Sequence, residues 1–241
     1  ERDVAWCDYD GDGRLDAIVA TGTGPSTPPF TSNKLFRNTA SGFVEVTTTS
    51  ISSAPAADTR AVICADFDSD GRVDVLFGQI SPGSTAYELH RNVLVNGAAT
   101  FNLVSGSGQG ITGSFAFNTQ TSVAIGESQK MSIAVGDLDS DNDLDIITPH
   151  GVYINSGGFA FLERTPATGA PVCHRVCALG DYDMDGHYDL FVGKPFDNNE
   201  LWKGNGDGTF TRITATQVIA TERDTEDVAF CDFDGDGDLD I

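Results

Sequence analysis

Five nine-residue segments of the chain follow one acidic pattern, in which aspartate occupies the first, third, fifth and ninth positions. They hold 22 aspartates, as many as the formal net charge of −22, so the acidity is concentrated in these segments. Carboxylates this close repel one another strongly unless a cation lies among them. The segments are DYDGDGRLD (8–16), DFDSDGRVD (66–74), DLDSDNDLD (137–145), DYDMDGHYD (181–189) and DFDGDGDLD (232–240).

Short apolar runs flank the acidic segments and predict buried β-strands. VAWC, VICA, IAVG, CALG and VAFC precede the five segments, and AIVA, VLFG, IITP and LFVG follow the first four. A strand, a Gly/Asn-rich turn and another strand come next, as in LWKGNGDGTFTRI, which is a hairpin signal. The repeating unit is therefore strand A, acidic loop, strand B, connection, strand C, hairpin and strand D.

A four-stranded unit that recurs in this way predicts an all-β fold, a β-propeller of four-stranded antiparallel blades. The starts of the acidic segments are 58, 71, 44 and 51 residues apart. We expect 1–241 to be a single propeller domain or fragment, with four complete blades and the start of a fifth. Part of a seven-bladed ring is favoured over a closed four-bladed ring. The blades are expected at 1–50, 59–105, 130–165, 173–215 and 226–241.

The spacing of the acidic positions predicts a calcium site in each loop. Carboxylates at positions 1, 3, 5 and 9 converge when the chain turns at position 6, where glycine, or Asn142 in one copy, tolerates a left-handed backbone. Position 7 adds a backbone carbonyl. Many oxygen ligands on a flexible loop suit Ca²⁺ better than Mg²⁺, which predicts one Ca²⁺ per loop and up to five in all. The predicted ligands are Asp8, Asp10, Asp12, Arg14 and Asp16; Asp66, Asp68, Asp70, Arg72 and Asp74; Asp137, Asp139, Asp141, Asp143 and Asp145; Asp181, Asp183, Asp185, His187 and Asp189; and Asp232, Asp234, Asp236, Asp238 and Asp240.

An EF-hand and a metal-free turn both fit the pattern less well than this calcium site. An EF-hand loop needs glutamate at position 12 and a helix on each side. Position 12 is instead Val19, Phe77, Thr148 or Val192, and strands are predicted on both sides. Turns built from Asp and Gly without a metal would explain one copy, but five copies with the same four carboxylates favour cation binding.

The repeats resemble the FG-GAP/VCBS repeats of integrin-α-type β-propellers, with CDFDGDGDLDI and LWKGNGDGTFTRI near the consensus. The resemblance extends over nearly the full length. The long segment 105–129, Asn142 in place of glycine and the cysteines before the loops depart from it. It implies an extracellular or cell-surface, secreted protein that holds Ca²⁺ between strands A and B of each blade.

The cysteines and histidines do not indicate a zinc or nucleophile site, because they are scattered and form no CxxC pair. Cys7 and Cys231 occupy the same repeat position and are expected to be small core residues. On an extended strand, Cys173 and Cys177 would share a face but lie too far apart to bond. We therefore expect buried thiols, or a disulfide to a distant partner. His187 needs only its carbonyl at position 7, so its side chain is expected to face solvent.

The sequence favours a non-enzymatic module for adhesion, recognition or assembly with protein partners. No GxSxG, HExxH or phosphate-binding loop occurs, the net charge argues against nucleic acid, and no apolar run could insert into a membrane. One alternative is a lectin-like propeller that binds glycans. A less favoured one is a propeller domain of a polysaccharide-acting enzyme, which would need clustered acids or bases outside the acidic loops.

The long connections between strands predict where a partner would bind. In a meandering blade, the A–B and C–D turns lie at one end, and the B–C and D–A connections lie at the other. Variable loops on a rigid scaffold usually carry binding, which favours the second end. The connections at that end are 20–33, 78–87, 105–129, 193–199 and 214–225. The candidate contact residues, each of which could equally pack locally, are Phe30, Phe115, Phe117, Lys194 and Phe196.

Overall fold

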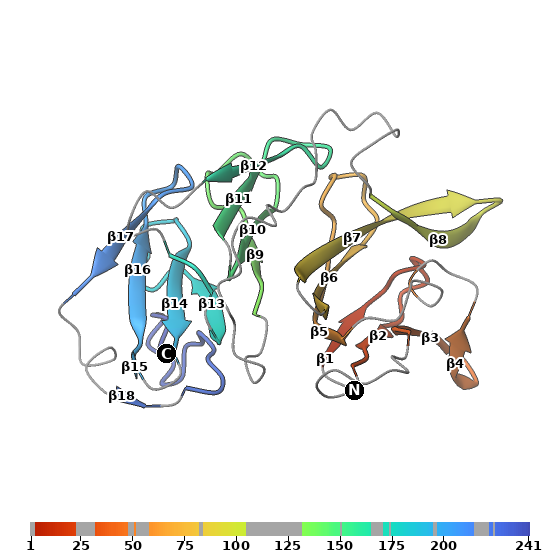
Figure 1. Ribbon diagram of the computed structural model, residues 1–241, viewed down its shortest axis with the longest axis horizontal. Helices are drawn as coiled ribbons and strands as arrows, with labels where there is room; N and C mark the ends of the chain where they lie inside the picture. Colours follow the sequence, from red (N-terminus) through yellow and green to blue (C-terminus); the bar gives the residue numbers. More distant parts are fainter. Residues whose placement is uncertain are drawn as a thin grey trace. The chain divides into compact units, whose positions relative to one another are not determined.

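The protein is an all-β chain whose sheets are the antiparallel blades of a β-propeller (Figure 1). In the part of the chain that the structure describes, four sheets contain four strands each, which confirms the predicted fold class. The chain forms two compact units, Glu1–Gln129 and Lys130–Ile241. The computed structural model describes residues 3–22, 32–47, 51, 58–81, 84–104, 132–149, 151–164, 171–173, 175–194, 197–214, 222–223 and 225–241.

The unit Glu1–Gln129 contains two blades, each with its strands paired in chain order. The first blade consists of β1 (Asp3–Cys7), β2 (Asp16–Ala20), β3 (Lys34–Thr39) and β4 (Gly42–Val46). The second consists of β5 (Asp58–Ala65), β6 (Asp74–Ser81), β7 (Ser84–Val95) and β8 (Ala98–Leu103). The acidic loops connect β1 to β2 and β5 to β6, as predicted.

The unit Lys130–Ile241 contains two further blades built in the same way. The third blade consists of β9 (Ala134–Gly136), β10 (Asp145–Thr148), β11 (Gly151–Asn155) and β12 (Phe161–Arg164). The fourth consists of β13 (Val176–Gly180), β14 (Asp189–Gly193), β16 (Glu200–Gly204) and β17 (Phe210–Ile213). A short pair, β15 (Asp197–Asn198) and β18 (Glu222–Arg223), forms a separate two-stranded sheet.

The register between strands A and B is the same in every repeat. The residue just before the acidic loop pairs with the ninth-position aspartate, as Cys7 does with Asp16. The other three blades keep this pairing. In the fifth repeat an isolated bridge joins Cys231 to Asp240, with backbone hydrogen bonds of 3.1 and 2.7 Å. The fifth repeat therefore begins like the other four, while the number of blades in the complete ring stays a prediction.

Apolar side chains from neighbouring blades share one core within each unit. Ile18 and Leu35 of the first blade cluster with Val75, Phe77 and Phe101 of the second, and all five are almost fully buried. In the other unit, the third and fourth blades meet through a cluster that includes Ile147, Ile154, Leu190, Val192 and Trp202. The runs that predicted buried strands therefore also supply the contacts between blades.

Backbone hydrogen bonds repeat at the junctions between blades. Thr21, after β2, accepts the N–H of Thr59 from the second blade at 3.1 Å. Thr148, at the end of β10, accepts the N–H of Cys173 at 3.1 Å in the same way. The carbonyl of Lys194, after β14, accepts the N–H of Thr225 at 3.5 Å. A carbonyl at the end of strand B or just after it thus anchors the next repeat at each of these three junctions.

A second kind of junction involves the acidic loops themselves. The carbonyl of Tyr9, at position 2 of the first loop, accepts the Asn92 amide of the second blade at 2.7 Å. The carbonyl of Leu138, at position 2 of the third loop, accepts the N–H of Gly208 of the fourth blade at 2.9 Å. Gly208 has φ of 75°, and a Cβ there would lie 2.6 Å from the Ile154 side chain. The hairpin can approach this closely only because the residue is glycine.

The cysteines confirm one expectation and correct two. Cys7 is buried in the core as expected, and it is also bonded to Cys64, which joins the first strands of two neighbouring blades. Cys173 and Cys177 are bonded to each other, so the prediction that they lie too far apart is wrong. Four extended residues would separate their Cα atoms by about 13 Å, but the chain bends before β13 and the distance is 5.4 Å. Cys231 is exposed rather than part of the core, and it has no disulfide.

We predict that the disulfide between blades stabilises its unit more than the local one does. Replacing Cys7 and Cys64 with alanine should lower the free energy of unfolding of the first unit by roughly 4 kcal/mol, because they are 57 positions apart. Replacing Cys173 and Cys177, only 4 positions apart, should cost the second unit roughly 2 kcal/mol. Urea unfolding followed by circular dichroism measures both values, and a larger cost for the local pair would contradict the prediction.

Candidate metal sites in the acidic loops

The first aspartate of each loop closes the turn by accepting two backbone hydrogen bonds. Asp8 accepts the N–H of Asp12 on Oδ1 at 3.0 Å and the N–H of Gly13 on Oδ2 at 2.7 Å. The first aspartates of the other four loops make the same two contacts with positions 5 and 6. The turn therefore folds around this carboxylate.

Two positions in each loop adopt the left-handed backbone conformation. Position 6 does so as predicted, with φ of 83° at Gly13 and 72° at Asn142. Position 4 does so as well, which we did not predict, and it holds Ser69 and Met184 at 56° in two of the loops. Glycine at position 4 of the first and fifth segments is the signal that could have revealed it.

The ninth aspartate of each of the four blades is buried and connects the loop to strand C. Asp16 accepts the N–H of Tyr9 at 3.2 Å and the N–H of Asn38, in β3, at 2.7 Å. The ninth aspartates of the other three blades are fully buried and make equivalent contacts. Their strand C donors are Asn92, Asn155 and Gly204.

The asparagine in strand C is a site residue that we missed from the sequence. The Asn38 amide donates to the carbonyl of Leu15 at 3.1 Å, which fixes the eighth loop residue to strand C. Asn92 and Asn155 make the same contact in their blades. The sequence pattern that could have revealed it is the asparagine that ends each of LFRN, LHRN and VYIN.

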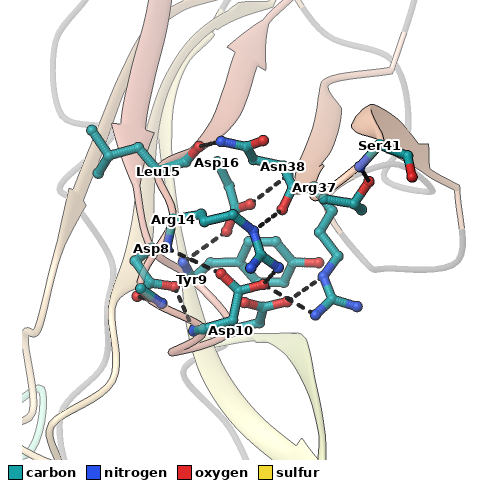
Figure 2. A network of polar contacts seen from close by, with 12 residues as sticks. Asp8, Tyr9, Asp10, Arg14, Leu15, Asp16, Arg37, Asn38 and Ser41 are labelled. Atoms are coloured by element: carbon teal, nitrogen blue, oxygen red, sulfur yellow. Dashed lines mark hydrogen bonds and ion pairs between the residues drawn. The ribbon is translucent and has the colours of Figure 1, made fainter.

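Three carboxylates in each loop lie close enough together to hold one ion. One oxygen from each of the three lies within 4.8 Å of the other two. Positions 1, 3 and 9 form this group in four loops, as Asp8, Asp10 and Asp16 do in the first (Figure 2). In the second loop, positions 1, 3 and 5 form it instead. The predicted ligands are thus partly brought together, and metal binding by each of them stays a prediction.

The fifth and seventh positions shape the loop in addition to their predicted role as ligands. Asp12 accepts the N–H of Arg14 at 3.1 Å, and the other loops repeat this contact. The Arg14 side chain folds back and donates to the carbonyl of Asn38 at 2.8 Å. His187 does not simply face solvent as we expected. Its side chain is half-buried, and its ring occupies the space that a Cβ at Gly206 would fill.

Three buried carboxylate oxygens that have no hydrogen bond point to a bound cation. Oδ1 of Asp10, of Asp68 and of Asp139 is buried and has no hydrogen-bond partner, and each belongs to position 3 of a loop. A buried carboxylate oxygen without a partner is costly. The donor set consists of carboxylate and carbonyl oxygens on a turn, which is the chemistry that Ca²⁺ prefers. The residues therefore fit a calcium ion.

Electrostatics in the loops also favour a cation. Burial raises the pKa of Asp74 to about 7 and that of Asp145 to about 6, although two backbone N–H groups oppose the shift in each case. The pKa of Asp139 is raised by burial and by the charges of Asp141 and Asp137. Each shift reflects a carboxylate whose charge is poorly stabilised, and a divalent cation would stabilise it.

Basic side chains contact three of the loops, a feature that we did not predict from the sequence. Arg37 Nε lies 2.5 Å from Asp10, and Figure 2 shows this guanidinium reaching into the loop. Arg91 contacts Asp68 at 2.6 Å, and Lys203 binds the fourth loop in the same way. These residues follow an aromatic residue or histidine in LFRN, LHRN and LWKG.

One of the five predicted partner-binding residues lies in the described part of the chain. Phe30, Phe115, Phe117 and Phe196 lie outside the described residues. Lys194 pairs with the buried Glu200 at 2.5 Å. Glu200 also accepts from Trp202 at 3.0 Å and pairs with Arg212 at 2.9 Å. Lys194 is thus held within its own blade. Among the described residues, no helix is long and apolar enough to cross a membrane.

Comparison with known protein families identifies one repeat family in two regions of the chain. Residues 4–77 and 181–241, together more than half of the chain, match the model of the FG-GAP-like repeat. The match includes the first, second, fourth and fifth acidic loops. No curated protein matches the chain.

Two substitutions in the third loop test the different roles of positions 9 and 3. In metal-free buffer, Asp145→Asn should lower the free energy of unfolding by about 1–3 kcal/mol, because one N–H donor would then face an amide NH₂. Asp145 accepts the N–H groups of Leu138 and Asn155 at 2.6 and 2.7 Å. Asp139→Asn is the matched control and should change the stability little or raise it. Urea unfolding compares them, and an equal loss for both would contradict the assignment.

Proposed function

The chain belongs to the FG-GAP-like repeat family, and on that premise we propose that it is a calcium-stabilised extracellular propeller, a non-catalytic recognition module for protein partners. The β-propeller scaffold supplies the rigid body. The acidic loops supply the calcium sites, and the connections at the opposite end of the blades supply the partner surface.

The observation that carries the calcium proposal is the position 3 carboxylate. In three loops one of its oxygens is buried without a hydrogen bond, beside two further carboxylates. Hydrogen bonds to the backbone of the loop and of strand C account for the aspartates at positions 1 and 9, but no hydrogen bond accounts for this oxygen at position 3. A bound Ca²⁺ gives it one, and also offsets the repulsion among the aspartates.

The disulfides and the repeat family support the proposed extracellular location. FG-GAP-like repeats are typically extracellular. Disulfides persist in oxidising compartments and are rare in the cytosol, and the described cysteines form two of them. Millimolar calcium is also compatible with the weaker sites of extracellular modules.

Hydrogen bonds that anchor the connections between strands support the proposed partner surface. Asn33 accepts the N–H of Thr21 at 3.0 Å, which fixes both ends of the connection from β2 to β3. Asn199 accepts the N–H of Lys194 at 3.1 Å in the fourth blade. Variable loops on a rigid base are the usual arrangement of a recognition surface.

Calcium should raise the melting temperature of the protein. A ligand that binds only the folded state stabilises it by about 2.7 kcal/mol per site at 100 times its Kd. Differential scanning calorimetry in CaCl₂ and in EDTA measures the effect, with MgCl₂ as the control for general screening. Equal melting temperatures in CaCl₂ and EDTA would contradict calcium binding.

Binding to an extracellular-matrix extract separates a protein partner from a glycan. We expect the labelled chain to bind the extract in the presence of calcium, to lose binding after protease treatment, and to keep it after enzymatic deglycosylation. Loss of binding only after deglycosylation would favour the lectin-like alternative and contradict the proposed partner class.

A further inference from the structure

Three of the four blades place a basic residue at the same point of strand C, against positions 3 and 5 of the acidic loop. Arg37 Nε is 2.5 Å from Asp10, and its Nη2 is 3.3 Å from Asp12. In the second blade, Arg91 Nη2 is 2.6 Å from Asp68 and 3.0 Å from Asp70. Lys203 pairs with Asp183 and Asp185 in the fourth blade.

The equivalence of these residues follows from the backbone register. Arg37 and Arg91 directly precede the asparagines whose N–H groups bind the ninth-position aspartates. Lys203 precedes Gly204, which makes that bond in the fourth blade. In the third blade, Asn155 donates this N–H bond, so the residue equivalent to Arg37, Arg91 and Lys203 is Ile154.

The third loop therefore lacks the basic group at this point. Ile154 is 3% exposed and packs in the core between the third and fourth blades. In the described part of the chain, no basic side chain pairs with Asp139 or Asp141. Oδ1 of Asp139 is buried without a hydrogen bond, and Asp139 groups with Asp137 and Asp145 within 4.8 Å.

We propose that the strand C residue before the N–H donor sets the calcium affinity of each loop, which makes 137–145 the tightest site among the four blades. The inference rests on the proposed calcium function. Arg37, Arg91 and Lys203 act as internal cations on the carboxylates that the ion would use. Calcium must displace them before it binds, whereas in the third loop no basic side chain of the described residues competes with it for Asp139 and Asp141.

The ranking predicts a graded response to calcium. Loop 137–145 fills first, at a calcium concentration up to about fivefold below that of the other three loops, because an ion pair with a partly exposed side chain contributes up to about 1 kcal/mol, which corresponds to that factor. The third blade is then stabilised at calcium levels at which the first, second and fourth still rely on their own basic residues.

Isothermal titration calorimetry with CaCl₂ tests the ranking. All variants carry Asp234→Asn, which removes the loop 232–240 from the comparison. Asp139→Asn should abolish the tightest binding phase, whereas the matched variant Asp68→Asn should leave that phase intact and remove a weaker one. Loss of the tightest phase in Asp68→Asn, with its retention in Asp139→Asn, would overturn the proposal.

A second pair of variants tests the basic residue directly. Arg91→Gln should tighten calcium binding at the second loop by up to about fivefold, and Arg91→Lys, which keeps the charge, should not. Melting temperature in EDTA checks that both variants fold. If calcium binds with equal affinity at every loop, or Arg91→Gln does not tighten it, the inference fails while the proposed function stands. If calcium binds nowhere, the proposed function fails as well.

Discussion

In each of the four blades, the buried aspartate at the ninth position of the acidic loop is the interaction on which the geometry of the blade depends. It accepts one N–H from the loop and one from strand C, so three segments of the blade meet at a single carboxylate. Burying that charge is costly, and the pKa of Asp74, raised to about 7, reflects the cost. Two charge-assisted hydrogen bonds offset part of it, and a cation beside the carboxylate would offset more.

The acidic loops also contribute to the packing between blades, which connects the proposed metal sites to that packing. The backbone of the first loop receives the Asn92 amide of the second blade, and that of the third loop receives the N–H of Gly208 of the fourth. A loop held rigid by an ion would therefore hold its neighbour more firmly. The disulfide between Cys7 and Cys64 reinforces the same junction covalently in the first unit. A bound calcium ion would therefore act on the same interface as the packing and the disulfide.

The sequence was sufficient for the features that repeat along it, and insufficient for those that depend on register or on a local bend. The acidic loops and the apolar runs beside them predicted the strands, the blades and the left-handed turn at position 6. The asparagine and the basic residue of strand C recur too, but their contacts with the loop follow from strand pairing, which spacing alone does not give. Cys173 and Cys177 were predicted wrongly because a bend before β13 brings together residues that an extended strand would separate.

The central claim is that each acidic loop is a cation site, and a crystal structure of the protein grown with calcium tests it most directly. The account predicts anomalous density for an ion among the carboxylates of positions 1 and 3 in every acidic loop, with Oδ1 of Asp10, Asp68 and Asp139 turned toward it. Loops that contain only water at saturating calcium, with Arg37 and Arg91 still paired to the same carboxylates, would contradict it.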